Sequence, residues 1–156
     1  MTTILRAEPA DAEAILGIQK RAFAAEAQAV QDWSIPPMAE TLASVLEHIR
    51  SACVFKAVDG DRVIGSIRGV LSGGVCSIHR LSVDEAYRGR GLGSALLTAV
   101  EQAHPAATGF ALTTNAAMEE NVRFYLRHGY RVEARVRYAE TITLVEMSKL
   151  SQAAGA

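Results

Sequence analysis

A glycine-rich segment, Arg88-Gly89-Arg90-Gly91-Leu92-Gly93, constrains the fold of this chain more than any other stretch. Residues 75–83 before it are mostly apolar or β-branched, which is typical of a strand. After it, apolar residues recur at helical spacing. The first turn of a helix combines unpaired N–H groups with the positive end of the peptide dipoles. We therefore predict a strand, a phosphate-binding loop and a helix, with the two arginines neutralising the anion.

Two common phosphate-binding motifs do not fit this loop. A dinucleotide fingerprint requires Gly-x-Gly-x-x-Gly, but Ser94 or Leu96 stands where the third glycine belongs, depending on the register. A P-loop ends in Gly-Lys-Ser or Gly-Lys-Thr, and the chain has no such tripeptide. A dinucleotide and a nucleoside triphosphate are both disfavoured as ligands, although a nucleotide-phosphate enzyme stays open as a third hypothesis.

The spacing Arg88-x-x-Gly91-x-Gly93 instead resembles the pyrophosphate-binding signature of the GNAT superfamily, the acyl-CoA-dependent N-acyltransferases. Two further segments match that family in order, residues 81–83 before the loop and Phe124-Tyr125-x-x-x-Gly129-Tyr130 after it. The resemblance extends from about residue 4 to residue 149. It implies acetyl-CoA as the cofactor and an amine as the acceptor.

The resemblance also implies how the cofactor is held. A splayed strand near Val83 would leave main-chain groups free for the pantetheine arm, and a backbone N–H there would serve as the oxyanion donor. Many members carry an asparagine seven residues before the later tyrosine; Met118 stands there in this chain, and we expect Asn121 to bind the cofactor instead. The expected cofactor-binding residues are Leu81, Ser82, Val83, Arg88, Gly89, Arg90, Gly91, Leu92, Gly93, Ser94 and Asn121.

The pattern along the chain predicts an α/β fold of the α+β type. We expect a mixed, mostly antiparallel sheet of about seven strands, flanked by about four helices, as in GNAT proteins. Pro36-Pro37 is expected to be a break, and Gly129 is expected to end the last helix. A length of 156 residues suits one domain, which we place at 1–150, with a flexible tail at 151–156. The expected helices are near 9–30, 42–49, 92–103 and 117–128, and the expected strands near 4–7, 53–59, 62–71, 75–83, 110–114, 131–136 and 140–149.

Charge and composition exclude several classes of protein. Lysine and arginine number 16 against 17 acidic residues, so no positive field recruits nucleic acid or a membrane. The two cysteines and scattered histidines form no metal-binding pattern. No apolar stretch has bilayer length, and acidic residues follow the N-terminus closely. We expect a cytoplasmic protein without a metal; a homodimer is common among similar proteins.

Two residues are candidates for the base that an amine acceptor needs. Glu26 lies three helical turns after Ile15 and shares a stripe with Ile15 and Ala22. In similar enzymes the first helix borders the acceptor pocket, so the resemblance implies that Glu26 could bind or deprotonate the amine. His79 alternates with Leu81 and Val83 on one strand face, and an imidazole with a pKa of ~6.5 could relay a proton. Alternatively, Glu26 lies at a helix edge in water and His79 fills a half-buried strand position.

Tyr125 matches the tyrosine that similar enzymes use as the general acid. A phenol with a pKa of ~10 is protonated at neutral pH and can donate to a thiolate whose conjugate acid is near ~8.5. The alternative is an aromatic ring packed in the core, for which Phe124 is better suited. A covalent route through Cys76 and His79 is disfavoured, because strand residues three apart point to opposite faces.

These observations favour an N-acetyltransferase that moves the acetyl group of acetyl-CoA to a primary amine of a small molecule or peptide. Direct attack in a ternary complex is the expected mechanism. The alternative is a noncatalytic acyl-CoA-binding sensor or partner protein. No motif identifies the acceptor.

Overall fold

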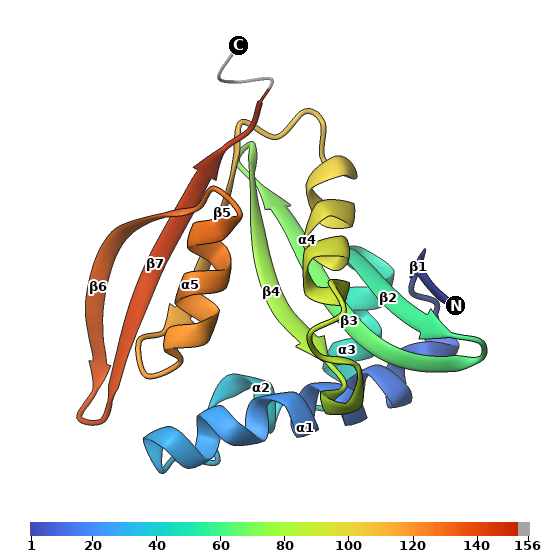
Figure 1. The fold of residues 1–156 in the computed structure, drawn as a ribbon, viewed down its shortest axis with the longest axis horizontal. Helices are drawn as coiled ribbons and strands as arrows, with labels where there is room; N and C mark the ends of the chain where they lie inside the picture. The colour runs from blue at the N-terminus through green and yellow to red at the C-terminus, as the bar shows by residue number, and fades with distance from the viewer. Residues whose placement is uncertain (153–156) are drawn as a thin grey trace.

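The computed structural model describes residues 1–152 and contains a seven-stranded sheet in the order β1-β2-β3-β4-β5-β7-β6 (Figure 1). Neighbouring strands run antiparallel except β4 and β5, which are parallel. The expected mixed, mostly antiparallel sheet is confirmed. The strands are β1 (Thr2–Arg6), β2 (Cys53–Asp59), β3 (Arg62–Ser72), β4 (Val75–Val83), β5 (Gly109–Asn115), β6 (Arg131–Ala139) and β7 (Ile142–Leu150).

Five α-helices flank the sheet, one more than expected. The additional helix is the single turn α2, at the position where Pro36-Pro37 was predicted to be only a break. Proline lacks an N–H that the first helical turn would leave unpaired, so it suits this position. The helices are α1 (Ala12–Val30), α2 (Pro36–Ala39), α3 (Leu42–Ser51), α4 (Leu92–Gln102) and α5 (Glu119–Arg127), with 3-10 turns η1 (Pro9–Asp11) and η2 (Glu85–Tyr87). Gly129 has a φ of 89° just after α5, as predicted.

Helices cover both faces of the sheet. On β3, a Cβ at Gly65 would lie 3.2 Å from Leu96 of α4, so this face carries α4. Arg68 of the same strand lines a pocket with residues of α2 and α3. Because successive strand residues point to opposite faces, α4 lies on one face while α2 and α3 lie on the other.

Gly69 of β3 allows α4 to approach closely, and we expect Gly69→Ala to destabilise the fold. The added Cβ would lie 2.7 Å from Val100 Cγ1 and 3.2 Å from Cys76 Sγ. Overpacking of this kind lowers the free energy of unfolding by about 1–3 kcal/mol, which urea titration would measure. The matched control is Gly17→Ala in α1, whose new Cβ meets only the flexible Arg21 side chain at 3.4 Å. The control should raise stability through helix propensity; equal effects at the two sites would contradict the packing argument.

The two central strands separate along their length. β4 and β5 pair only at Val75–Gly109, Cys76–Phe110 and Ser77–Ala111, although β4 continues to Val83 and β5 to Asn115. Figure 1 shows the strands side by side at one end and apart at the other, where α1 and α2 lie. Beyond Ser77 and Ala111, the facing edges of β4 and β5 no longer pair with each other. The splay that the resemblance implied is therefore present.

A β-bulge interrupts β4 inside this splay. Ser66 pairs with Ser82 and Arg68 with His79, so Arg80 and Leu81 together oppose a single residue of β3. Arg80 has a φ of 58°, in the left-handed region. Such an extra residue breaks the alternation of side chains along a strand.

The bulge overturns one expectation about side-chain direction. Leu81 and Val83 pack against the core cluster that contains α4, whereas His79 lines the pocket beside α2 and α3. The prediction that His79 shares a face with Leu81 and Val83 is therefore wrong, because that prediction assumed unbroken alternation.

Among residues 1–152, no helix is both long enough and apolar enough to cross a bilayer. Ser151, the first residue of the expected tail, is 8% exposed, and its N–H donates to Thr108 O at 3.1 Å. The rest of that expected tail, from residue 153 on, lies outside the described residues.

Candidate active site

The glycine-rich loop presents unpaired backbone donors, as its sequence predicted. Gly89 and Gly91 have φ values of 77° and 81°, and Gly91 is the N-cap of α4. The first helical hydrogen bond runs from Ala95 N–H to Gly91 O at 3.0 Å. Within the described residues, the N–H groups of Leu92 and Gly93 donate to no protein acceptor. These donors form the kind of helix N-terminus that holds a phosphate.

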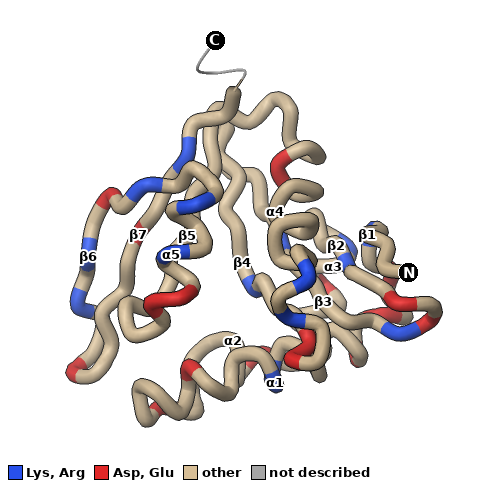
Figure 2. Tube along the Cα trace, viewed as in Figure 1, with Lys and Arg blue, Asp and Glu red and all other residues tan. Residues whose placement is uncertain are grey.

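Two exposed arginines flank these donors, and Figure 2 shows basic segments in the loop that leads into α4. The guanidinium of Arg90 lies 4.9 Å from the centre of the Tyr87 ring. Tyr87 in turn donates its hydroxyl to Asp59 at 2.6 Å. Arg90 is therefore oriented by a stacked aromatic ring, while Arg88 extends into solvent. Both residues fit the acidic pyrophosphate of a coenzyme A molecule.

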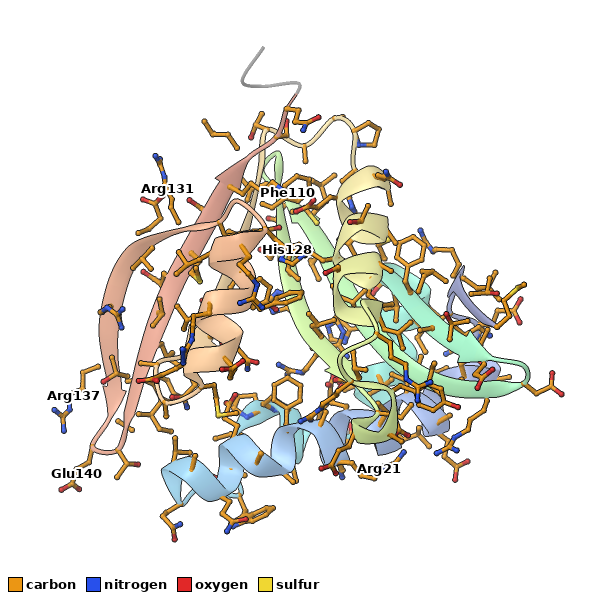
Figure 3. All side chains as sticks on the ribbon, viewed as in Figure 1. Arg21, Phe110, His128, Arg131, Arg137 and Glu140 are labelled. Atoms are coloured by element: carbon orange, nitrogen blue, oxygen red, sulfur yellow. The ribbon has the colours of Figure 1, made fainter. Side chains whose placement is uncertain are left out.

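The first turn of α4 contacts the end of α5. Ser94 Oγ lies 2.8 Å from His128 Nε2, and His128 Nδ1 lies 2.7 Å from Phe124 O. Since a carbonyl only accepts, Nδ1 donates to Phe124 O, and Nε2 shares a hydrogen bond with the Ser94 hydroxyl. His128 follows α5 and projects toward α4 (Figure 3). The Ser94 side chain is therefore engaged by His128, and nothing in the sequence had indicated His128 as its partner.

Tyr125 lies in the core, and its hydroxyl has no hydrogen-bond partner among residues 1–152. The residue is 9% exposed, and its ring makes edge contacts with Phe124 and Tyr130 at centroid distances of 5.2 and 5.7 Å. No hydrogen bond joins its hydroxyl to any described residue, whereas Tyr130 donates to Glu101 Oε2 at 2.7 Å. Burial raises the pKa of Tyr125, so the phenol stays protonated at neutral pH.

Phe124 was expected to be the ring packed in the core, but Tyr125 is the more buried of the two. Phe124 is the half-buried ring and packs near Gly93, while Tyr125 is the buried one. The Tyr125 ring can pack in the core and the hydroxyl can still donate, because no described residue accepts the hydroxyl proton.

Glu26 is half-buried at the open end of the splay. Burial raises its pKa, against the opposing effects of the Asn115 side chain and the positive charge of Arg80. Asn115 ends β5 and Arg80 lies in the bulge of β4, so Glu26 of α1 lies near both separated strands. A raised pKa makes a carboxylate a stronger base.

The stripe of α1 that was used to place Glu26 is only partly correct. The buried residues of α1 are Ala12, Ile15, Ile18, Gln19, Ala27 and Val30. Ala22, which lies on the same stripe as Ile15 and Glu26, is only half-buried. The second half of the helix packs with Ile35 and with Ile142 of β7.

The other candidates are positioned differently. His79 is exposed in the pocket beside α3, and desolvation by the surrounding protein, followed by the charges of Arg80 and Arg68, lowers its pKa. Ser82 is buried and donates its hydroxyl to Arg80 O at 3.1 Å, so its side chain is committed to the bulge. Asn121 is half-buried in the first turns of α5, and its side chain has no hydrogen bond to a described residue.

Neither cysteine is suited to covalent catalysis. Cys76 is fully buried, and burial raises its pKa to about 11, while burial also raises the pKa of Cys53. A thiol in that state is a poor nucleophile at neutral pH. Within residues 1–152, no three His, Cys, Asp or Glu side chains gather as metal ligands.

Sequence reasoning missed a buried ionic cluster around Glu40. Its carboxylate accepts from Arg68 Nη2 at 3.1 Å, Arg80 Nε at 3.1 Å and Gln19 Nε2 at 2.9 Å. Ser44 Oγ donates to the second oxygen at 2.7 Å. The one available signal was Arg68 itself, a charged residue within the otherwise apolar or small residues 63–70.

The comparison with known proteins agrees with this geometry. Residues 13–130 match the model of the Acetyltransferase (GNAT) family. The chain belongs to this family. It is 34% identical over 76 residues to an N-acetyltransferase of Bacillus subtilis named YjcF, which is uncharacterized. That match covers 47% of this chain and 52% of YjcF, so the chain matches about half the length of that relative.

Solved structures share the fold at low identity. The ribosomal-protein-S18-alanine N-acetyltransferase of Escherichia coli has a TM-score of 0.81 at 18% identity, over 97% of this chain and 94% of that one. The PaiA N-acetyltransferase of Thermoplasma acidophilum, in complex with coenzyme A, has a TM-score of 0.81 at 15% identity, over 96% and 99%. The putative acetyltransferase yncA of Salmonella typhimurium, with acetyl-CoA, has a TM-score of 0.78 at 17% identity, over 97% and 95%.

These findings confirm the GNAT fold, the family and acetyl-CoA as the cofactor of that family. The family is one of acetyltransferases, in agreement with the expected class, an acyl-CoA-dependent N-acyltransferase. The roles of Glu26, His79 and Tyr125, and the identity of the acceptor, stay predictions.

Proposed function

We propose that this protein transfers the acetyl group of acetyl-CoA to a primary amine of a small molecule or peptide, by direct attack in a ternary complex. Acetyl-CoA supplies the activated acyl group. The unpaired N–H groups at the start of α4, together with Arg88, fit its pyrophosphate. The unpaired edge of β4 beyond Ser77 fits the pantetheine arm and the thioester.

The observation that supports the proposal is that Glu26 of α1 interacts with Asn115 at the end of β5 and with Arg80 in the bulge of β4. In the proposed reaction, Glu26 accepts a proton from the acceptor ammonium, which frees the nitrogen lone pair for attack on the thioester carbonyl. The C–N bond forms and the C–S bond breaks, the Tyr125 hydroxyl donates its proton to the leaving sulfur, and the nitrogen gives up its second proton to solvent, from which the Tyr125 phenolate is reprotonated. A main-chain N–H near Val83 donates to the carbonyl oxygen.

The test is a coupled measurement of binding and turnover. Calorimetry would give the affinity for CoA, and continuous detection of free thiol would follow acetyl-CoA consumption with a panel of primary amines. We expect thiol release that depends on the amine, together with mass-spectrometric detection of the acetylated amine. Tight CoA binding without turnover for any amine would instead support a noncatalytic acyl-CoA sensor.

We expect Glu26→Gln to remove the acidic limb of the pH dependence of kcat/KM. In the wild type, activity should be lost as the pH falls through the raised pKa of Glu26, since only the ionised carboxylate accepts a proton. The variant should be slower by about 10²–10⁴-fold and keep only the limb that comes from the amine itself. His79→Gln is the matched control and should retain both limbs. A missing limb in His79→Gln, with a normal profile in Glu26→Gln, would assign the base to His79.

A further inference from the structure

The pocket beside Arg80 lies next to the proposed reaction centre. It has a volume of about 550 Å³ and is bounded by residues of α2, α3, β3 and β4. Arg68, His79, Arg80 and Glu40 supply polar walls, and Val70 supplies an apolar one. Arg80 also interacts electrostatically with Glu26, so one side chain adjoins both the pocket and the proposed base.

The pocket carries a net positive charge. Burial opposes ionisation of Glu40, but hydrogen bonds from Arg68, Ser44 and Gln19 outweigh it and lower the pKa of Glu40 to about 2. Glu40 is therefore a carboxylate at neutral pH and balances one of the two arginines. Because the pKa of His79 is lowered, that imidazole adds no positive charge at neutral pH, so the side chains lining the pocket carry one more positive than negative charge; Glu26, which also interacts with Arg80, lies outside that lining.

The two arginines also retain unused donors. The Arg68 side chain is 6% exposed, and its Nε is buried without any hydrogen-bond partner among the described residues. Arg68 contacts Glu40 through Nη2, and Arg80 does so through Nε. Each guanidinium has five N–H donors, so both keep donors that Glu40 does not use. A buried donor without a partner is costly, which favours an acceptor that arrives with a ligand.

Glu40 acts as a positioning residue in this arrangement. Gln19 donates to its Oε1 at 2.9 Å and Ser44 to its Oε2 at 2.7 Å, which ties the carboxylate to α1 and α3. The fixed carboxylate in turn orients the guanidinium groups of Arg68 and Arg80 against the same side of the pocket. Planar guanidinium groups held in this way match the geometry of a carboxylate ligand.

We propose that the pocket binds the carboxylate of the amine acceptor through Arg68 and Arg80, so that the acceptor is a free amino acid. This inference rests on the proposed function. The amine of such a molecule would reach Glu26 while its carboxylate meets the arginines, because Arg80 adjoins both. The side chain of the amino acid would lie along Val70. An acceptor with a second ammonium group would be repelled by the net charge of the pocket.

Matched acceptors test the inference on the unmodified protein. Leucine, leucinamide and 3-methylbutylamine differ in the carboxylate alone, and phenylalanine, phenylalaninamide and phenethylamine form a second series. We expect kcat/KM to be about 10–100-fold higher for each acid, the range for a hydrogen bond to a charged group. The amide has the less basic amine, so a preference for the acid cannot come from amine ionisation. Equal or higher values for the amides would overturn the inference while leaving the proposed function intact.

Binding gives a second readout that does not depend on turnover. Calorimetry in the presence of CoA would compare N-acetylleucine with N-acetylleucinamide. Stronger binding of the acid without any turnover would support the carboxylate site and overturn the proposed function. Equal or undetectable binding of both would overturn the carboxylate site.

Variants at the arginines complete the test. Arg80→Gln and Arg68→Lys should each raise the KM for leucine about tenfold and leave the KM for acetyl-CoA unchanged. Arg68→Lys keeps a positive charge beside Glu40, so this variant should fold even where a neutral replacement of Arg68 would not. The control is Arg50→Gln, an exposed arginine of α3 outside the pocket. Equal losses for leucine and leucinamide in the pocket variants would show a structural role and overturn the inference.

Discussion

Tyr125→Phe is expected to lower kcat by about 10²–10⁴-fold, the contribution typical of a general acid. The substitution keeps the ring that packs against Phe124 and Tyr130 and removes only the hydroxyl. That hydroxyl bonds to no described residue, so neither the melting temperature nor the affinity for CoA should change. Thiol-release kinetics, thermal melting and calorimetry with CoA would measure the three quantities separately.

Tyr130→Phe is the matched control for this prediction. Its hydroxyl donates to Glu101, which also accepts from Lys149 at 3.1 Å. Its removal should cost about 1–3 kcal/mol of stability, because a charged acceptor loses a donor, and should leave kcat near the wild-type value. If Tyr125→Phe lost stability and CoA affinity as much as turnover, the tyrosine would be a packing residue and the leaving sulfur would need another acid.

Gly91→Glu is expected to weaken CoA binding by about 100-fold or more, equivalent to about 2.7 kcal/mol. Space is not the reason, since a Cβ at this position would meet no atom within 4 Å. The carboxylate would instead enter the anion site at the start of α4, where it repels the pyrophosphate. The φ of 81° adds strain of about 1–2 kcal/mol for any residue with a side chain. Calorimetry with CoA would measure the loss of affinity.

Gly60→Glu separates the two effects. Gly60 lies in the turn between β2 and β3, has a φ of 62°, and has the same open surroundings as Gly91. The Gly60→Glu variant should lose about as much stability as Gly91→Glu, without any change in its affinity for CoA. The Gly91→Ala variant should show the same backbone strain with a smaller loss of affinity for CoA. Normal CoA binding by Gly91→Glu would show that the pyrophosphate lies elsewhere, and the assignment of the loop would fail.

The boundaries of β2 and β4 matched the sequence prediction, while the ends of the helices shifted by a few residues. The larger errors came from positions where a local pattern is interrupted by a distant contact. His79 was assigned to the wrong face because the bulge at Arg80 depends on pairing with β3. The burial of Phe124 and Tyr125 was predicted the wrong way round, because it depends on how α5 packs against the core.

The sequence by itself determined the order of strand, loop and helix around residues 88–93, and with it the family, because glycine conformation and helical period are local properties. The tertiary structure alone decided which side chains meet at the site. Glu40 reaches Arg68 and Arg80 across 28 and 40 residues of chain, and Glu26 reaches the end of β5. Such long-range pairs are set by packing and by the bulged register of β4, which no local pattern encodes.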